Sequence, residues 1–317
     1  MLRTRLCDIL DIDYPIIQAG MGAATSAELV AAVSNAGGLG SLGAFLRPPD
    51  DFLNELATLS SLTNRSFALN DVVPALAEDT FTAALQARPK VLSLALAHPG
   101  DHVKRAHDAG VLVMHQITTV RQAVEAAECG VDIIVAQGGE AGGYGGVVAS
   151  LPLIPQVVDA VAPLPVVAAG GIFDGRGMAA ALMLGAVGVN VGTRFLATPE
   201  APFQEWKEPI TGAASEDAVK VAFINDLMPV PGTVGYGTEL RAIRTPVVDH
   251  WRERRQEARA NPDDAIAKLA GANRANLPVS GQSAGGIREI LPAQEIVRRF
   301  MQEAEEALQS AASFIEQ

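Results

Sequence analysis

Short, almost wholly apolar runs recur through the first two thirds of this chain, and they constrain its fold more than any other feature. Such runs are typical of strands buried on both faces of a parallel sheet. Ala-rich segments with helical spacing separate them, as in residues 119–129, where Thr119 and Gln122 match a capping box. The eight runs are PIIQA from Pro15, LGSLG from Leu39, FALN from Phe67, VLSLAL from Val91, VLVMH from Val111, DIIVAQ from Asp132, PVVAAG from Pro165 and VGVNVG from Val187.

This alternation of strands and helices predicts an α/β fold, and the number of strands favours a closed (β/α)8 or TIM barrel. Doubly wound sheets usually have about five or six strands, whereas a barrel needs eight. The 317 residues allow one barrel plus an elaboration, since such barrels commonly occupy about 250 residues. A barrel places its chemistry in the turns that follow the strands. We therefore expect the functional site at the carboxyl ends of the strands.

The pattern changes after about Thr198, where Pro and charged residues become more frequent. A helical stretch is expected from Pro246 to Ala270, and an amphipathic helix from Pro292, with Ile296, Phe300, Ala304 and Leu308 on one face. We predict three parts: a barrel over residues 1–199, a mainly helical insertion with a loop that covers the site over 200–291, and a C-terminal helix over 292–317 that packs on the barrel.

Composition excludes several classes of function. The formal net charge of −12 and the lack of a basic run argue against a nucleic-acid partner. Cys7 and Cys129 have no CxxC spacing and no His cluster nearby, so neither a disulfide framework nor a metal site is expected. The chain has no run of about 18 apolar residues and no signal-peptide core at its start. We expect a cytoplasmic protein without a membrane partner, and the oligomeric state, a homo-oligomer included, stays open.

The turns after the last two strands have the strongest functional signal. The segments AAGGIFDGRG (168–177) and VGTRF (191–195) have glycines and a threonine just before helices, where free backbone N–H groups bind anions. Phosphate binding by the loops after strands seven and eight recurs in these barrels. The alternative is that the glycines only turn the chain. The predicted phosphate ligands are Gly170, Gly171, Gly192 and Thr193.

Two other turns consist almost entirely of small residues. The segment AQGGEAGGYGG (136–146) has only one bulky side chain, Tyr144, and QAGMG (18–22) follows the first strand. Such loops can lie flat against a planar ligand, although the longer one is equally well explained as a flexible lid.

In this order, the motifs PIIQAGMG, FALN, AQGGEAGGYGG, AAGGIFDGRGMAAALMLGA and VGTRFLATPE resemble those of the nitronate monooxygenase family, formerly called 2-nitropropane dioxygenases. The likeness spans about Pro15 to Pro199 and extends weakly to VSGQSAGGIREI (279–290). It implies an FMN barrel that oxidises alkyl nitronates with O2 to a carbonyl compound and nitrite. It does not separate this activity from two sister activities in which NAD(P)H reduces the flavin: quinone reduction and enoyl-carrier-protein reduction.

The resemblance also implies how FMN is held. The flavin ring would lie against Gly20, Met21 and Gly22, with Asn70 and Gln116 near its pyrimidine edge. Gln282 would reach down from the late loop. The ribityl chain and phosphate would contact Gln137, Gly139, Gly142, Gly143, Gly170, Gly171, Gly192 and Thr193.

The sequence departs from the family at Tyr144, where the loop usually reads EAGGH and the histidine is proposed to assist catalysis. A phenol with a pKa near 10 is a poor base at neutral pH but a good hydrogen-bond donor or acid. We predict Tyr144 and His98 as catalytic residues, with His98 as the candidate replacement for the imidazole. His115 fits better as a packed residue. A thiol nucleophile is not expected, and a flavin-binding barrel without activity stays an alternative that turnover would exclude.

Overall fold

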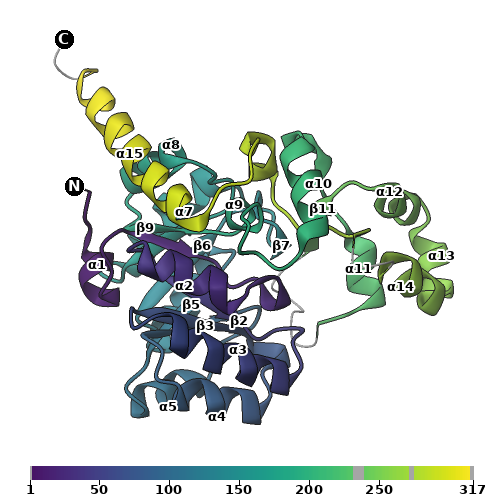
Figure 1. Cartoon of the computed structure of the whole chain (residues 1–317), viewed down its shortest axis with the longest axis horizontal. Coiled ribbons are helices and arrows are strands. Elements are labelled where there is room, and N and C mark those ends of the chain that lie inside the picture. The colour runs from purple at the N-terminus through teal and green to yellow at the C-terminus, as the bar shows by residue number, and fades with distance from the viewer. Residues whose placement is uncertain (1, 231–238, 271–274, 315–317) are drawn as a thin grey trace.

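The computed structural model describes residues 2–230, 239–270 and 275–314. Eight parallel strands form one sheet in the order β1-β9-β8-β6-β5-β4-β3-β2, and an isolated parallel bridge between Ile17 and Leu39 closes it. This confirms the predicted (β/α)8 barrel (Figure 1). The strands are β1 (Ile16–Gln18), β2 (Gly40–Gly43), β3 (Phe67–Val72), β4 (Val91–Ala95), β5 (Leu112–Ile117), β6 (Ile133–Gln137), β8 (Val166–Ala169) and β9 (Gly188–Val191), and each lies within or largely overlaps one of the eight apolar runs.

Side chains alternate across each strand between the inside of the barrel and the surrounding helices. On β5, Met114 belongs to a small buried cluster of strand residues, whereas Val113 and Ile117 belong to the large cluster shared with the helices. The small cluster also contains Leu6 and Cys7 of α1 (Arg5–Leu10), which therefore closes the amino-terminal end of the barrel. The opposite end, where the carboxyl ends of the strands meet, is left for the site.

The helices of the barrel begin where short polar side chains cap them. Ser26, Thr119 and Asp174 accept hydrogen bonds from the backbone at the first turns of their helices. The predicted capping box at Thr119 forms only in part, because Gln122 Oε1 accepts from Thr118 N (2.9 Å). The helices are α2 (Ala27–Asn35), α3 (Pro49–Leu62), α4 (Glu78–Gln86), α5 (His102–Asp108), α6 (Val120–Glu128), α7 (Ser150–Val161), α8 (Gly175–Met183) and the short α9 (Thr193–Leu196).

The segment after the barrel strands holds two short strands that the sequence analysis missed. These strands, β10 (Ala218–Lys220) and β11 (Glu239–Ile243), form an antiparallel sheet with β7 (Gly143–Gly145) in the order β10-β11-β7. Three residues of β10 are too few for a periodic signal, and β7 is glycine-rich, so the pairing has no local signature. Helices make up much of the rest: α10 (Lys207–Gly212), α11 (Ala222–Leu227), α12 (Pro246–Glu253), α13 (Arg255–Ala260) and α14 (Pro262–Ala270).

The stretch expected as one helix from Pro246 to Ala270 is thus three helices, separated at Arg254 and Asn261. Both separating residues leave the helical region, with ψ values of 40° and 65°. These helices lie at one side of the barrel (Figure 1). The division at residues 199/200 and 291/292 stays a prediction.

The last helix, α15 (Ala293–Ala312), runs along α8 and also contacts α2 (Figure 1). Its predicted apolar face is buried at Ile296, Phe300 and Ala304. Gly175 of α8 allows the close approach, since a Cβ there would lie 2.4 Å from the Phe300 carbonyl oxygen. Within the described ranges, no helix combines the length and apolar character needed to cross a membrane.

Candidate active site

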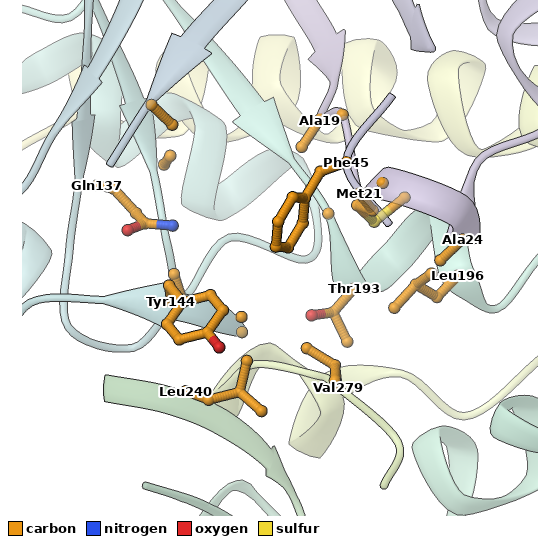
Figure 2. A pocket seen from close by; sticks show the side chains of 18 of the residues that line it. Ala19, Met21, Ala24, Phe45, Gln137, Tyr144, Thr193, Leu196, Leu240 and Val279 are labelled. Carbon is orange, nitrogen blue, oxygen red and sulfur yellow. The ribbon is translucent and has the colours of Figure 1, made fainter. Parts of the chain in front are cut away.

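A cavity of about 290 Å³ opens at the carboxyl ends of the barrel strands (Figure 2). Its floor comes from the turns after the strands, and its outer wall from the glycine-rich loop, α11, β11 and residues near Val279. The structure brings together thirteen of the predicted site residues in its lining: Gly20, Met21, Gly22, Asn70, Gln116, Gln137, Gly142, Gly143, Tyr144, Gly170, Gly171, Gly192 and Thr193.

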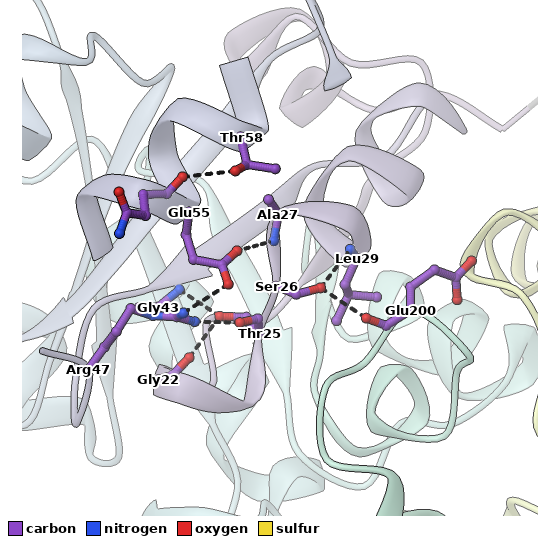
Figure 3. A network of polar contacts seen from close by, with 11 residues as sticks. Gly22, Thr25, Ser26, Ala27, Leu29, Gly43, Arg47, Glu55, Thr58 and Glu200 are labelled. Atoms are coloured by element: carbon purple, nitrogen blue, oxygen red, sulfur yellow. Dashed lines mark hydrogen bonds and ion pairs between the residues drawn. The ribbon is translucent and has the colours of Figure 1, made fainter. Parts of the chain in front are cut away.

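The turn after β1 is fixed by a buried polar network (Figure 3). Thr25 Oγ1 donates to Gly22 O and accepts from Gly43 N, both at 2.8 Å. Arg47 donates to Gly43 O (3.2 Å) and pairs with Glu55 (3.2 Å). Gly22 has φ +54°, and a Cβ on Gly43 would lie 2.3 Å from Gly22 N. Only glycine at both positions permits this approach of β2 to the turn, which places Gly22 at the cavity.

Gly20 and Asn70 are packed against each other. A Cβ on Gly20 would lie 2.2 Å from Asn70 Cβ, so the turn needs glycine there. Asn70 Nδ2 donates to Ser93 O at 3.1 Å, which orients the amide on β3. The backbone of Gly20 and Gly22 therefore lines this part of the cavity, and β3 packs directly against it at Gly20.

The two turns predicted to bind phosphate lie side by side at the ends of β8 and β9. Gly170 and Gly171 have φ values of +97° and +75°, which favour glycine. Gly192 precedes α9, and Thr193 Oγ1 accepts a hydrogen bond from Gly281 N (2.9 Å). The threonine hydroxyl hydrogen remains available to donate. The backbone of both turns faces the cavity.

Two buried amide oxygens in the lining have no hydrogen-bond partner among the described residues: Gln137 Oε1 and Asn190 Oδ1. Buried acceptors are rarely left unpaired in a native protein, so a ligand with N–H or O–H donors is expected beside them. Gln137 was predicted from the sequence. Asn190 was missed because it is part of the apolar run of β9. A polar amide within an apolar strand is nevertheless unusual, and this alone could have marked it as a site residue.

The loop over residues 279–290 packs against the glycine-rich loop over residues 136–146. Gln282, the first residue of the 3-10 helix η5 (Gln282–Gly286), donates from its backbone N to Glu140 O (2.9 Å). A Cβ on Gly142 would lie 2.5 Å from the Ser280 carbonyl carbon, so the two loops touch there. Ser283, not Gln282, lines the cavity, and Gly139 also lies outside the lining.

Tyr144 is the only ionisable residue in the described lining of the cavity. It lies on β7 opposite Leu240 of β11, half-buried among apolar side chains (Figure 2). Burial raises the pKa of the phenol above its usual value of 10. Its hydroxyl has no hydrogen-bond partner within the described part of the chain. At neutral pH the group is therefore a protonated donor facing the cavity.

Two cations from the segment after the barrel hold the loop that contains Tyr144. Lys220 Nζ donates to Gly145 O (2.9 Å) and Glu239 O (3.0 Å), and Arg241 Nη2 donates to Gly139 O (2.8 Å). Burial, together with the charge of Arg241, lowers the pKa of Lys220 to about 8. The sequence analysis missed both residues because they lie on strands, in a segment that was expected to be mainly helical.

The two histidines considered as replacements lie outside the cavity lining. His98 is exposed, and its Nδ1 accepts from Gly100 N (3.2 Å), so its placement does not support the predicted catalytic role. His115 is 1% exposed and lies on the outer face of β5, beside Val113 and Ile117 rather than Met114. Burial lowers the pKa of His115 to about 3. It is a packed residue, as the sequence favoured.

The cysteines are remote from the site. Cys7 is buried under the amino-terminal end of the barrel, and Cys129 Sγ donates to Gly100 O (3.4 Å). No group of three or more His, Cys, Asp or Glu side chains suited to a metal ion occurs in the described ranges.

The fold and site thus define a β/α barrel with a ligand cavity at the carboxyl ends of its strands. A family profile described as nitronate monooxygenase matches residues 3–86 and 77–303. The chain belongs to this family, whose members are flavin enzymes, and the resemblance found in the sequence is confirmed.

Relatives within the family differ in their activities. A (3aS,4S,5R,7aS)-5-hydroxy-7a-methyl-1-oxo-octahydro-1H-indene-4-carboxyl-CoA dehydrogenase of Mycobacterium tuberculosis is 41% identical over 203 residues, which are 63% of this chain and 57% of the relative. The chain thus matches little more than half the length of that protein. A probable nitronate monooxygenase of Staphylococcus aureus is 33% identical over 267 residues, covering 68% of this chain and 74% of the relative.

Solved structures resemble the whole chain. FabK from Thermotoga maritima superposes with a TM-score of 0.88 and 32% identity, covering 99% of this chain and 100% of FabK. A nitroalkane oxidase from Streptomyces ansochromogenes has a TM-score of 0.80 and 28% identity, covering 97% and 100%. The relatives include a dehydrogenase, a monooxygenase and an oxidase, so they agree on an oxidoreductase and differ in their substrates.

Proposed function

We propose that the cavity binds FMN and that the chain is an FMN-dependent oxidoreductase. The two glycine turns at the ends of β8 and β9 offer one site for a phosphate, which suits a mononucleotide flavin. Gln137 Oε1 and Asn190 Oδ1 are unpartnered acceptors for hydroxyl or ring N–H donors. Gly20 and Gly22 have no side chain to fill the space beside them, which leaves room for a planar ring. These residues would hold the cofactor, and when bound it supplies electron transfer between substrates.

A test of the phosphate site replaces Gly171 or Gly192 with valine. At Gly192 a Cβ has only Met21 Sδ (3.5 Å) and Ala19 Cβ (3.9 Å) nearby, so valine fits the protein but projects toward the cavity. We expect the Kd for FMN, measured by fluorescence quenching, to rise at least about tenfold in both variants. Gly212→Val is the matched control for Gly192→Val, and Gly110→Val, at a glycine with φ +74°, is the matched control for Gly171→Val, because a Cβ at either control position meets no atom within 4 Å. Unchanged FMN affinity in both test variants would move the phosphate site elsewhere.

For the substrate, we propose a neutral compound with a double bond conjugated to a carbonyl group, such as an enoyl thioester, reduced at the expense of NAD(P)H. The carrying observation is that Tyr144 is the only ionisable residue in the described lining. An anionic substrate that has no cation beside it, and that lies away from the backbone N–H groups of the phosphate turns, would lose its solvation. A neutral substrate escapes that cost, and its carbon chain suits a cavity whose lining includes Phe45, Leu240 and Val279.

Tyr144 has the properties of the proton donor in such a reaction. Reduction adds two electrons and a proton at one carbon and a second proton at the other, and Tyr144 Oη donates the second proton. Solvent then returns a proton to the phenolate. Because burial raises the pKa of Tyr144, the donor form persists throughout the neutral range. The FabK and CoA-dehydrogenase relatives support this class of substrate.

Nitronate oxidation with O2 is the second candidate, supported by the Staphylococcus relative and the nitroalkane oxidase structure. A nitronate arrives already deprotonated, so the lack of a base in the described lining does not prevent its oxidation. Tyr144 would then donate a hydrogen bond to a nitronate oxygen.

Anaerobic mixing separates the two candidates. The FMN-loaded protein is mixed in turn with NADH, NADPH, propionate 3-nitronate and a C3 alkyl nitronate, and flavin absorbance is followed. For the reductase we expect bleaching by NADH or NADPH and recovery on addition of a short trans-2-enoyl thioester. Bleaching by a nitronate, with none by either nicotinamide nucleotide, would reject the reductase in favour of nitronate oxidation.

The missing base gives a prediction for nitroalkanes. Tyr144→His would introduce a group with a pKa near 6.5, able to remove a proton from carbon at pH 7. If nitronates are substrates, we expect this variant to raise turnover of neutral nitroalkanes while nitronate turnover stays within about threefold. Equal wild-type rates on both forms, after correction for spontaneous deprotonation, would contradict the argument and require a base outside the described lining.

A further inference from the structure

A second hollow, of about 330 Å³, lies in the segment after the barrel and has a basic lining. We call it the basic cleft. It is formed where β10, α11, α12 and α13 meet, and its lining comprises Lys220, Ala222, Phe223, Arg244, Asp249, Arg252, Glu253 and Arg255. Four cations face two carboxylates there, in a chain whose formal net charge is −12. A local surplus of positive charge on an acidic protein attracts anions to this one place.

The cations of the cleft are only partly neutralised by the protein. Arg244 and Arg252 share one carboxylate, Asp249, at 3.1 and 3.5 Å. Lys220 has no carboxylate partner within ion-pair distance among the described residues. Arg255 is paired with Asp226, which lies outside the lining. Two guanidinium groups on one carboxylate leave N–H donors for another anion, and their planar geometry matches a phosphate.

The basic cleft adjoins the proposed active site. Phe223 lines the cleft, and the next residue of α11, Ile224, lines the flavin cavity. Lys220 of the cleft donates to Gly145 O, next to Tyr144. Successive residues of a helix point about 100° apart, so the two hollows lie on neighbouring faces of α11. A reactant with an extended phosphorylated tail could occupy both.

We propose that the basic cleft binds the phosphorylated adenosine end of a reactant whose other end enters the flavin cavity. This inference rests on the proposed reductase function. Two reactants of that reaction have such an end: a coenzyme A thioester, with a 3′-phosphate, and NADPH, with a 2′-phosphate. The shared chemistry is an adenosine bisphosphate on a flexible linker, and the position of the phosphate distinguishes the two sources.

Binding is tested by calorimetry on the FMN-loaded protein, with adenosine 3′,5′-bisphosphate, adenosine 2′,5′-bisphosphate and inorganic phosphate as probes. We expect saturable binding of one bisphosphate and a Kd about tenfold higher in Arg244→Gln and in Arg252→Gln. Arg254→Gln is the matched control, since this neighbouring arginine lies outside the lining. Tighter binding of the 3′,5′ isomer assigns the cleft to coenzyme A, and of the 2′,5′ isomer to NADPH.

Absence of binding by both bisphosphates, or an unchanged Kd in both cleft variants, would overturn the proposal. Because calorimetry needs no turnover, this outcome is distinct from a failure of the reductase function. A kinetic measurement adds a second readout. In Arg252→Gln we expect about a tenfold fall in kcat/KM for the reactant that carries the matching phosphate, relative to a pantetheine thioester or NADH that lacks it. An unchanged ratio for both reactants would also count against the cleft.

Discussion

Replacing Tyr144 with phenylalanine is expected to slow substrate turnover by a hundredfold or more while FMN binding stays intact. The change removes only the hydroxyl, which is the single ionisable group in the described cavity lining. Loss of one hydrogen-bond donor aimed at developing charge typically costs about 2.7 to 4 kcal/mol in the transition state. Stopped-flow absorbance, which resolves reduction of the flavin from its reoxidation by substrate, identifies the affected step. For a proton donor that step is reoxidation by the unsaturated substrate.

The control is Tyr14→Phe, which makes the same change at a residue that packs against the outer core, remote from the cavity. A reoxidation rate in Tyr144→Phe within about threefold of the wild type would mean that Tyr144 lines the cavity without donating a proton. If the rate falls by a factor between these two limits, the dependence of the wild-type rate on pH gives a further test. Since burial raises the pKa of Tyr144, the wild-type rate should not fall between pH 6 and 9 through loss of its proton.

Replacing Asp71 with asparagine is expected to remove part of the fall in the free energy of unfolding that the wild type shows between acidic and neutral pH. Asp71 is 5% exposed on β3, and its carboxylate accepts a hydrogen bond from Val72 N (2.7 Å). No cation of the described residues forms an ion pair with it. Burial raises the pKa of Asp71 from 3.8 to about 6. The folded state therefore holds this proton more tightly than the unfolded state.

The sign of the pH effect follows from proton linkage. Between about pH 4 and 6 the folded state binds more protons at Asp71, so the free energy of unfolding falls as pH rises. The shift corresponds to about 3 kcal/mol across that window, which Asp71→Asn should remove. Urea titrations of both proteins at pH 4 and 7 measure the difference. Asp159→Asn, at an exposed position on α7, is the control, and a wild-type slope equal to that of Asp71→Asn would contradict the prediction.

The pattern of the sequence alone predicted the barrel and many of the residues that line its cavity. Buried parallel strands have continuous apolar runs that depend only on local composition, so all eight could be located. Glycine turns such as residues 170–171 are equally local, because only glycine readily adopts the positive φ they need. In a barrel, every turn after a strand lies at the same end. Because the strands could be located in the sequence, the turns that follow them could also be assigned to one end of the barrel.

Other parts of the site were decided only by tertiary structure. The strand that holds Tyr144 pairs with β11, about a hundred residues later in the chain, and Lys220 and Arg241 fix it through backbone carbonyl groups. Every residue has a backbone carbonyl group, so the residue types of this loop do not show that Lys220 and Arg241 bind it. His98 follows β4 in the sequence, as a site residue should, yet it is exposed outside the lining. Sequence order specifies the end of the barrel at which a residue lies, whereas side-chain direction depends on packing against segments that are remote in the chain.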